Sequence, residues 1–98
     1  MNAIEENYFC KDSEGRLTML LVAIQVPIFE NGDYSTRVVI GDRNVGRMPI
    51  RGVTAMQSLE LAIDFAKKLL NGFIEDGNRI YIARPGTSGP EEDDLWNF

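Results

Sequence analysis

The chain contains no histidine, and its single cysteine, Cys10, has no second cysteine with which to form a disulfide. Histidine is the commonest general base and a frequent metal ligand, so its absence removes the usual starting point for catalysis or metal binding. A lone cysteine in a strand pattern is typical of a structural thiol in a reducing compartment. We therefore expect no catalytic residue, no metal and no cofactor, and we expect a cytoplasmic location.

Long apolar runs are also missing, since a membrane-spanning helix needs about 18 consecutive apolar residues. The first residues are acidic, whereas a secretory signal starts with basic residues. These two features predict no membrane association. The 98 residues are 44% hydrophobic and 26% charged, which are ordinary values for one soluble globular domain.

Positive charge is scarce, because 10 basic residues face 15 acidic ones and the net charge is −5. Four of the acids are consecutive, at residues 91–94, and without residues 91–98 the body has 11 acids and 10 bases. Affinity for nucleic acid depends mainly on neutralising phosphates with Lys and Arg. We therefore expect no nucleic-acid partner.

The segment 37–51 differs from the rest of the body because its local charge is +3. It carries four arginines against one aspartate; the arginines are Arg37, Arg43, Arg47 and Arg51. Such asymmetry can guide partners, and it predicts an anion site or a docking site for the acidic tail. The alternative is that the basic and acidic surfaces are solvated and never meet.

Apolar residues follow the acidic run in the tail: Leu95, Trp96 and Phe98. A short docking segment combines charge, which guides association, with aromatic side chains, which supply affinity, and the tail has both. We therefore divide the chain into one domain, residues 1–85, and a flexible acidic and aromatic tail, residues 86–98. The tail has three candidate docking sites: its own body, the arginine segment of a dimer mate, or another protein. A disordered end is the alternative.

The pattern of apolar residues predicts strands at residues 3–10, 17–24, 34–40 and 80–83, with a further short strand possible at 47–51. In the first strand, Glu6 breaks the apolar parity of its neighbours. Pro27 lacks an N–H group, so strand pairing should weaken or switch edge there. Asn31 and Gly32 predict a tight hairpin, because a type I′ turn needs positive φ at both central residues.

One long helix is the clearest element of the sequence. Thr54 and Gln57 fit a capping box, and the helix should end at Asp76 with Gly77 in the left-handed conformation. An apolar face follows at helical spacing, formed by Met56, Leu59, Ile63, Ala66, Leu70 and Phe73. The predicted fold is α+β, an antiparallel sheet of about four strands in the order β-β-β-α-β with one helix on one face.

Two further apolar residues of the helix, Leu61 and Phe65, lie outside this face and one turn apart. They predict an interface, and our hypothesis is a homodimer through this flank or through the second face of the sheet. The bland alternative is that they are ordinary exposed residues or are covered by the loop at 41–52. A different possibility is an apolar ligand pocket between helix and sheet, lined by Met19, Met56, Phe65 and Phe73.

The helix opening at residues 52–62, Gly-Val-Thr-Ala-Met-Gln-Ser-Leu-Glu-Leu-Ala, resembles a family of small bacterial domains of unknown function. Members pair an N-terminal β-meander with a helix that opens G-V-x-x-x-Q-x-L-x-L-A. The resemblance covers roughly residues 16–72 and implies an α+β fold but no activity. Members often have Trp and Cys-Pro in the hairpin region, where this chain keeps only Pro27. In size and character the chain is also similar, by analogy, to accessory proteins on bacterial mobile gene cassettes.

Two classes of function are compatible with these features. The first is a non-catalytic protein-interaction module of the inhibitor, immunity or adaptor type, which fits the small size, the acidic aromatic tail and the wide apolar face of the helix. The second is a dimeric small-molecule-binding domain with an apolar pocket between helix and sheet. A cavity favours the second class, and a flat apolar patch favours the first.

Overall fold

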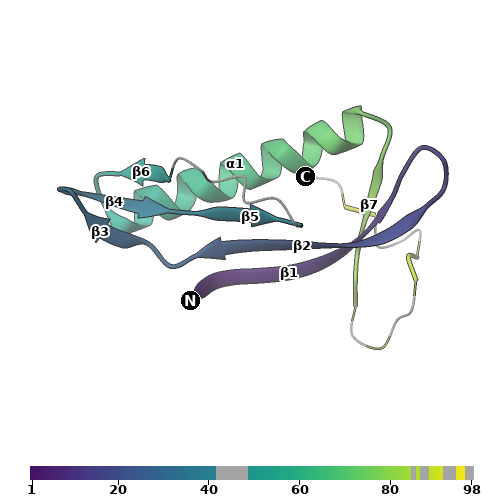
Figure 1. Cartoon of the computed structure of the whole chain (residues 1–98), viewed down its shortest axis with the longest axis horizontal. Coiled ribbons are helices and arrows are strands. Elements are labelled where there is room, and N and C mark those ends of the chain that lie inside the picture. Colours follow the sequence, from purple (N-terminus) through teal and green to yellow (C-terminus); the bar gives the residue numbers. More distant parts are fainter. Residues whose placement is uncertain (42–48, 85, 87–88, 92–94, 97–98) are drawn as a thin grey trace.

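The computed structural model describes residues 1–41, 49–84, 86, 89–91 and 95–96. Seven strands and one helix lie in this part of the chain (Figure 1). In chain order they are β1 (Asn2–Lys11), β2 (Leu17–Gln25), β3 (Ile28–Glu30), β4 (Asp33–Thr36), β5 (Val38–Ile40), β6 (Ile50–Gly52), α1 (Ala55–Glu75) and β7 (Arg79–Ile82).

The strands form two antiparallel sheets, and α1 packs against them, so the fold is α+β as predicted. The larger sheet has the order β5-β2-β1-β7, and the smaller has the order β3-β4-β6. In Figure 1, α1 runs lengthwise above β4 and β5 and reaches β7 at its C-terminal end. The sequence analysis predicted one sheet where the structure has two.

The division into two sheets has a local cause. The chain from β2 to β5 is one long hairpin. Its lower part, β2 paired with β5, belongs to the larger sheet, and its tip, β3 paired with β4, belongs to the smaller one. The change from one sheet to the other occurs near Pro27 in the first arm and at Arg37 in the second. Proline cannot donate to a strand ladder, so pairing between the arms is interrupted there. The predicted strand at 34–40 is therefore two strands, β4 and β5. Next to this interruption, on the side of the larger sheet, the Gln25 N–H donates a hydrogen bond to the Arg37 carbonyl oxygen at 2.9 Å.

The tip of this hairpin agrees with the prediction from the sequence. Glu30 pairs with Asp33, which leaves Asn31 and Gly32 as the two turn residues. Their φ angles are 55° and 86°, so both adopt the left-handed conformation that a type I′ turn requires.

The start of α1 is also the predicted one. Thr54 is the N-cap, and its hydroxyl oxygen accepts a hydrogen bond from the Gln57 backbone N–H at 3.0 Å. The Gln57 side chain reaches back and accepts from the Val53 N–H at 2.6 Å, one residue before the cap. At the other end, Asp76 is the C-cap and Gly77 has a φ of 99°. Both ends of the helix therefore have partners for backbone groups that the helix itself leaves unpaired.

Most of the predicted face of α1 packs on the core, since Leu59, Ile63, Ala66, Leu70 and Phe73 lie in the core cluster or against it. The most buried stripe, however, is shifted toward small residues. Ser58, Ala62, Ala66 and Leu70 are the buried residues of the helix, whereas Met56 is 72% exposed. Small side chains lie on this stripe because β6 comes close to the first turns of the helix. A Cβ atom at Gly52 would lie 2.5 Å from the Ser58 backbone nitrogen. The Ser58 hydroxyl is hydrogen bonded to the Thr36 hydroxyl of β4 at 2.9 Å, and both residues are buried.

The core lies between α1 and the sheets. Its buried members come from β1, β2, β5, α1, β7 and the tail: Tyr8, Val22, Ile24, Val38, Ile40, Ala62, Ala66, Leu70, Ile80 and Trp96.

Candidate functional site

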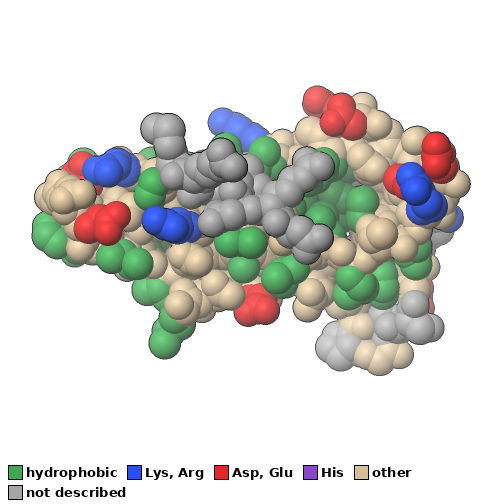
Figure 2. All heavy atoms as spheres, viewed as in Figure 1, with side chains coloured by type: hydrophobic (Ala, Val, Ile, Leu, Met, Phe, Trp, Pro, Cys, Tyr) green, Lys and Arg blue, Asp and Glu red, His purple; other side chains and the backbone are tan. Residues whose placement is uncertain are grey.

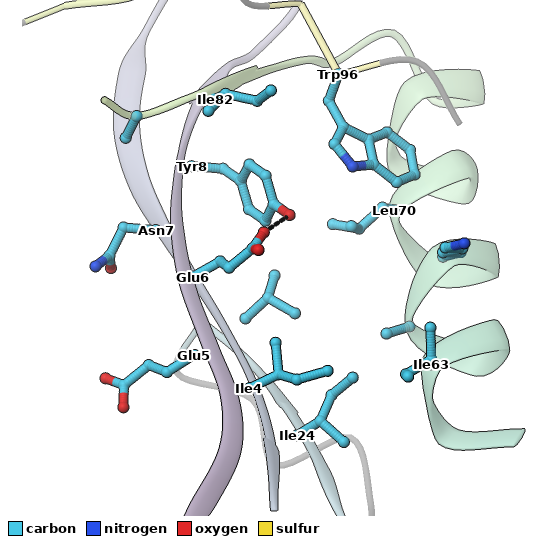
Figure 3. A pocket seen from close by; sticks show the side chains of 14 residues that line it. Ile4, Glu5, Glu6, Asn7, Tyr8, Ile24, Ile63, Leu70, Ile82 and Trp96 are labelled. Atoms are coloured by element: carbon cyan, nitrogen blue, oxygen red, sulfur yellow. Dashed lines mark hydrogen bonds between the residues drawn. The ribbon is translucent and has the colours of Figure 1, made fainter. Parts of the chain in front are cut away.

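A hollow of about 660 Å³ separates the second half of α1 from β1. Most of its lining is apolar and comes from five parts of the chain: β1, β2, α1, the β7 segment and Trp96 (Figure 3). Four polar side chains complete the lining, namely Glu5, Glu6, Asn7 and Lys67, and all four are exposed. The hollow therefore has a buried apolar interior and a charged rim that solvent reaches.

The hollow follows from how α1 lies on the two sheets. The contacts of the helix are concentrated on β6 and β4, where Gly52 and Ser58 allow a close approach. Further along, the helix residues that face the hollow are Ile63, Ala66, Lys67 and Leu70. The strand across from them is β1, which is not among the main contacts of the helix. A helix held close at one end thus leaves space beneath the rest.

β1 places alternate side chains on opposite sides. Ile4, Glu6 and Tyr8 point toward α1, whereas Glu5 and Asn7 point away from it (Figure 3). This is the two-residue period of a strand. The Tyr8 hydroxyl donates a hydrogen bond to the Glu6 carboxylate, which is two residues away on the same face. Glu6 therefore carries its negative charge on the side of β1 that faces α1, at the exposed rim of the hollow.

The environment of Tyr8 keeps its hydroxyl protonated. Burial raises the pKa of Tyr8 well above its usual range, and the hydrogen bond and charge of Glu6 raise it further. A hydrogen bond from the Trp96 side chain acts in the opposite direction on this pKa. Because the indole N–H only donates, Tyr8 accepts from Trp96 and donates to Glu6. These contacts fix the floor of the hollow at its β7 end.

Trp96 closes this end of the hollow. Its side chain is 4% exposed and lies between β7 and α1, near Leu70 (Figure 3). Leu95 forms an antiparallel bridge with Tyr81, and the Trp96 N–H donates to the Ile80 carbonyl oxygen at 2.7 Å. Residues 95–96 thus lie along the outer edge of β7. Trp96 is a core residue of its own chain, which agrees with the first of the three predicted docking sites of the tail, its own body.

One edge of β1 is unpaired over part of its length. β7 pairs with Tyr8 through Lys11, and a last bond of 3.4 Å joins the Ala83 N–H to the Asn7 carbonyl oxygen. The preceding residues pair with β2 along their other edge. Within the described residues, nothing pairs with the β7-side edge of residues 3–6. This open edge borders the hollow, since Ile4, Glu5 and Glu6 belong to both.

The residues predicted to line a pocket do not line this hollow. Met19 and Met56 are 57% and 72% exposed, so neither lies between helix and sheet. Phe65 and Phe73 are half-buried against the core, and neither belongs to the hollow's lining. For Met56 the physical reason is that small residues of α1 meet the sheet. The β1 residues were not predicted as part of a site. Glu6 was the available indication, because it is a carboxylate on the side of the strand whose other residues are apolar.

Of the predicted arginines, two lie in the described part of the chain, and Arg51 pairs with Ser35, two residues before Arg37. Arg37 and Arg51 are exposed, at the β4–β5 junction and on β6. Arg43, Arg47 and Phe98 lie outside the described residues. Leu61 is 43% exposed, while Phe65 packs against the core, so only Leu61 of this predicted pair is an exposed apolar side chain.

Other apolar side chains are exposed around the β3–β4 end of the molecule. Figure 2 shows apolar groups at this end, and Ile28 and Phe29 are the exposed ones on β3. The Phe29 ring packs against Tyr34 with centroids 5.1 Å apart. Phe29 and Tyr34 are also paired across β3 and β4, so this contact stabilises the hairpin.

The described residues contain no group of three or more His, Cys, Asp or Glu side chains able to hold a metal ion. Burial, and to a smaller extent the charge of Asp12, raises the pKa of the Cys10 thiol. A thiol with a raised pKa is a weak nucleophile at neutral pH. No helix in the described part of the chain is long and apolar enough to cross a membrane.

Comparison with known proteins gives no relative on which to base a function. No family model matches the chain, and neither the curated proteins nor the solved structures contain a match. The resemblance of the helix opening to a bacterial family therefore stays a prediction, and the site has to be interpreted from its own geometry.

Proposed function

We propose that this chain is a non-catalytic protein-interaction module of the inhibitor, immunity or adaptor type, and that the hollow beside β1 is its binding site. The observation that carries the proposal is the coincidence of three features at one place: an apolar hollow, a charged rim and an open strand edge. Protein partners use each of these features, as a pocket for an anchor side chain, a steering charge and a backbone template.

The composition of the rim favours a macromolecular partner over a small apolar ligand. Glu5, Glu6, Asn7 and Lys67 are exposed around the hollow, and the interior behind them is apolar. A buried apolar centre with a polar, solvated rim is the usual anatomy of a protein interface. The single cysteine adds a reducing, cytoplasmic setting to the proposal.

A dimeric small-molecule-binding domain is the second candidate. Its support is the size of the hollow, which falls in the range of roughly 300–1,000 Å³ found for ligand pockets. Leu61 is the exposed apolar residue that the dimer would use. The two candidates differ in what fills the hollow, and this difference can be measured.

The test is a selection of random linear peptides on the immobilised wild-type protein, followed by affinity measurement on a matched pair of variants. Ile82 lines the hollow, whereas Ile28 lies on β3 outside it, and both are exposed strand residues. We expect Ile82→Arg to weaken the selected peptides at least tenfold and Ile28→Arg to leave their affinity unchanged, with both variants folded by circular dichroism.

Two outcomes would contradict the proposal. One is that no peptide is enriched on the wild-type protein. The other is that the enriched peptides bind both variants equally well, which would place their site outside the hollow. Native mass spectrometry of the purified protein then tests the second candidate, since a retained small molecule displaced in Ile82→Arg would support ligand binding.

A further inference from the structure

We infer that the partner enters as an extended segment that pairs with the open edge of β1, and that this segment carries basic side chains toward Glu6. The inference rests on the proposed function and names the partner's conformation and charge. Its grounds are the hydrogen-bonding direction of β1, the space beneath α1, and the charge of the edge.

The backbone of β1 offers free groups at the position where a strand would add. In an antiparallel ladder, consecutive residues direct their N–H and C=O groups to alternate sides. The Asn7 carbonyl oxygen points toward β7, because it accepts from the Ala83 N–H. Glu5, two residues earlier, therefore presents its N–H and C=O to the same side, beyond the reach of the β1–β7 pairing. An added strand finds a donor and an acceptor at Glu5.

Such a strand would lie along the border of the hollow, since Ile4, Glu5 and Glu6 belong to both the open edge and the lining. Neighbouring strands lie about 4.8 Å apart, so a segment beside residues 3–6 would continue the sheet there. Its alternate side chains would point toward the helix and into the apolar interior near Ile63 and Leu70 (Figure 3). The other side chains would point to the outer face, where Glu5 and Asn7 lie. Both the edge and the hollow are thus used by one extended segment.

Charge selects the kind of segment that pairs there. Glu5 and Glu6 put one carboxylate on each face of the open edge. A basic residue across from either one forms a favourable cross-strand pair, and an acidic residue is destabilising. A second copy of this chain, paired edge to edge through β1, would bring these glutamates close to their own copies. We therefore assign the edge to a partner segment that carries basic residues across from Glu5 and Glu6 and apolar residues at its other positions that face α1.

The backbone claim is tested with Glu5→Pro and its matched control Glu5→Ala. Both variants remove the carboxylate, but proline also removes the N–H that faces the open edge. The bonds between β1 and β2 involve the neighbouring residues, so proline at an edge position leaves that ladder intact. With peptides selected on the wild-type protein, we expect Glu5→Pro to bind about tenfold more weakly than Glu5→Ala. The reason is that proline loses the backbone hydrogen bond to the peptide and its ring fits poorly against the added strand.

Hydrogen exchange on the wild-type protein gives a second measurement that does not depend on a variant. The Glu5 amide should exchange rapidly in the free protein and slow at least tenfold when a selected peptide is bound. Unchanged exchange at Glu5 with a saturating peptide would overturn strand addition, even where Glu5→Pro fails to fold.

The charge claim is tested with Glu6→Lys, with Glu60→Lys as its control. Glu60 is an exposed residue of α1 that does not line the hollow. Peptides enriched on the wild-type protein should combine apolar residues with Lys or Arg on the face that meets Glu6. They should bind Glu6→Lys about fivefold or more weakly, because a cross-strand pair of up to about 1 kcal/mol is replaced by repulsion. A fresh selection on Glu6→Lys should enrich acidic residues instead.

The outcomes separate this inference from the proposed function. If no peptide binds in the hollow, the proposed function fails. If peptides bind there but Glu5→Pro equals Glu5→Ala and the Glu5 amide stays unprotected, the function stands and strand addition is wrong. If wild-type protein is a dimer in light scattering and Glu5→Pro is a monomer, the edge belongs to a second copy and the assignment to a basic partner is overturned.

Discussion

The two halves of α1 lie against the rest of the molecule in different ways. The first half is held close, with Gly52 of β6 beneath it and Ser58 hydrogen bonded to Thr36 at 2.9 Å. The second half faces β1 across a hollow that is closed at one end by Trp96. The same helix therefore makes a dry polar contact at one end and borders a solvent-accessible site at the other.

This difference shows where the chain has room for function. Small residues on a helix allow a sheet to approach closely, and close packing leaves no space for a ligand. The second half has larger side chains, and the hollow separates them from β1. Trp96, which completes the packing there, comes from the C-terminal tail. The contrast predicts that changes near Gly52 affect stability alone, while changes around the hollow affect binding as well.

The largest effect should come from removing the side chain that closes the hollow. Trp96 is buried between β7 and α1, and truncating a core aromatic residue costs about 3 kcal/mol or more. We expect Trp96→Ala to lower the free energy of unfolding by that amount in urea denaturation. Its neighbour Leu95 is 43% exposed, so Leu95→Ala should cost less than about 1 kcal/mol. Equal losses in the two variants would contradict the docking of Trp96.

A smaller effect is expected at the tight end, at Gly52. An added methyl group would lie 2.5 Å from the Ser58 nitrogen and 2.8 Å from its Cα, so β6 and α1 must move apart. Overpacking of this kind costs about 1–3 kcal/mol, and we expect Gly52→Ala to lower the melting temperature accordingly.

Gly72, in the loose half of the same helix, supplies the opposite control. A Cβ atom there meets nothing within 4 Å. Alanine in a helix is more favourable than glycine by about 0.5–1 kcal/mol, so Gly72→Ala should raise the melting temperature. A loss of stability in Gly72→Ala, or none in Gly52→Ala, would remove the distinction between the two halves.

Much of the fold could be predicted because its signals are local. The Asn31-Gly32 turn, the Thr54 and Gln57 cap and the end of the helix at Gly77 each depend on a few adjacent residues. The split into two sheets was harder, since Pro27 indicated an interruption but not that the partner arm would break at Arg37. Apolar periodicity located most of the face of α1 that packs on the core, but it wrongly included Met56, because close approach selected small residues there.

The candidate site was harder to predict than the fold because it forms where distant segments meet. Glu6 stood out as a carboxylate on an apolar parity, yet nothing near it in the sequence indicates Lys67 or Trp96. The tail's aromatic residues suggested docking but left its own body, a dimer mate and another protein open, because the packing of Trp96 depends on the space between β7 and α1. Such long-range complementarity has no periodic signature in a single sequence.

The smallest predicted effect concerns the hydroxyl of Tyr8 and appears only at alkaline pH. Burial and Glu6 raise the folded-state pKa of Tyr8 above its value in the unfolded chain. The unfolded state therefore loses this proton first, and the stability due to Tyr8 is fully present below a pH of about 10 and falls as pH rises above it. Tyr8→Phe should unfold more easily at neutral pH, having lost its contacts with Glu6 and Trp96, but its stability should fall less steeply above that pH.

Melting temperatures of both proteins, measured from neutral to alkaline pH, check this prediction. All other groups are common to both proteins, so the difference between the two curves isolates Tyr8. The curves should converge as pH rises, because the wild-type protein alone loses the contribution of a protonated Tyr8. Parallel curves would mean that Tyr8 ionises equally easily in the folded and unfolded states. The hydroxyl would then not be held between Glu6 and Trp96. The end of the hollow near β7 would lack the hydrogen bonds that the Ser58–Thr36 contact provides at the other end of the helix.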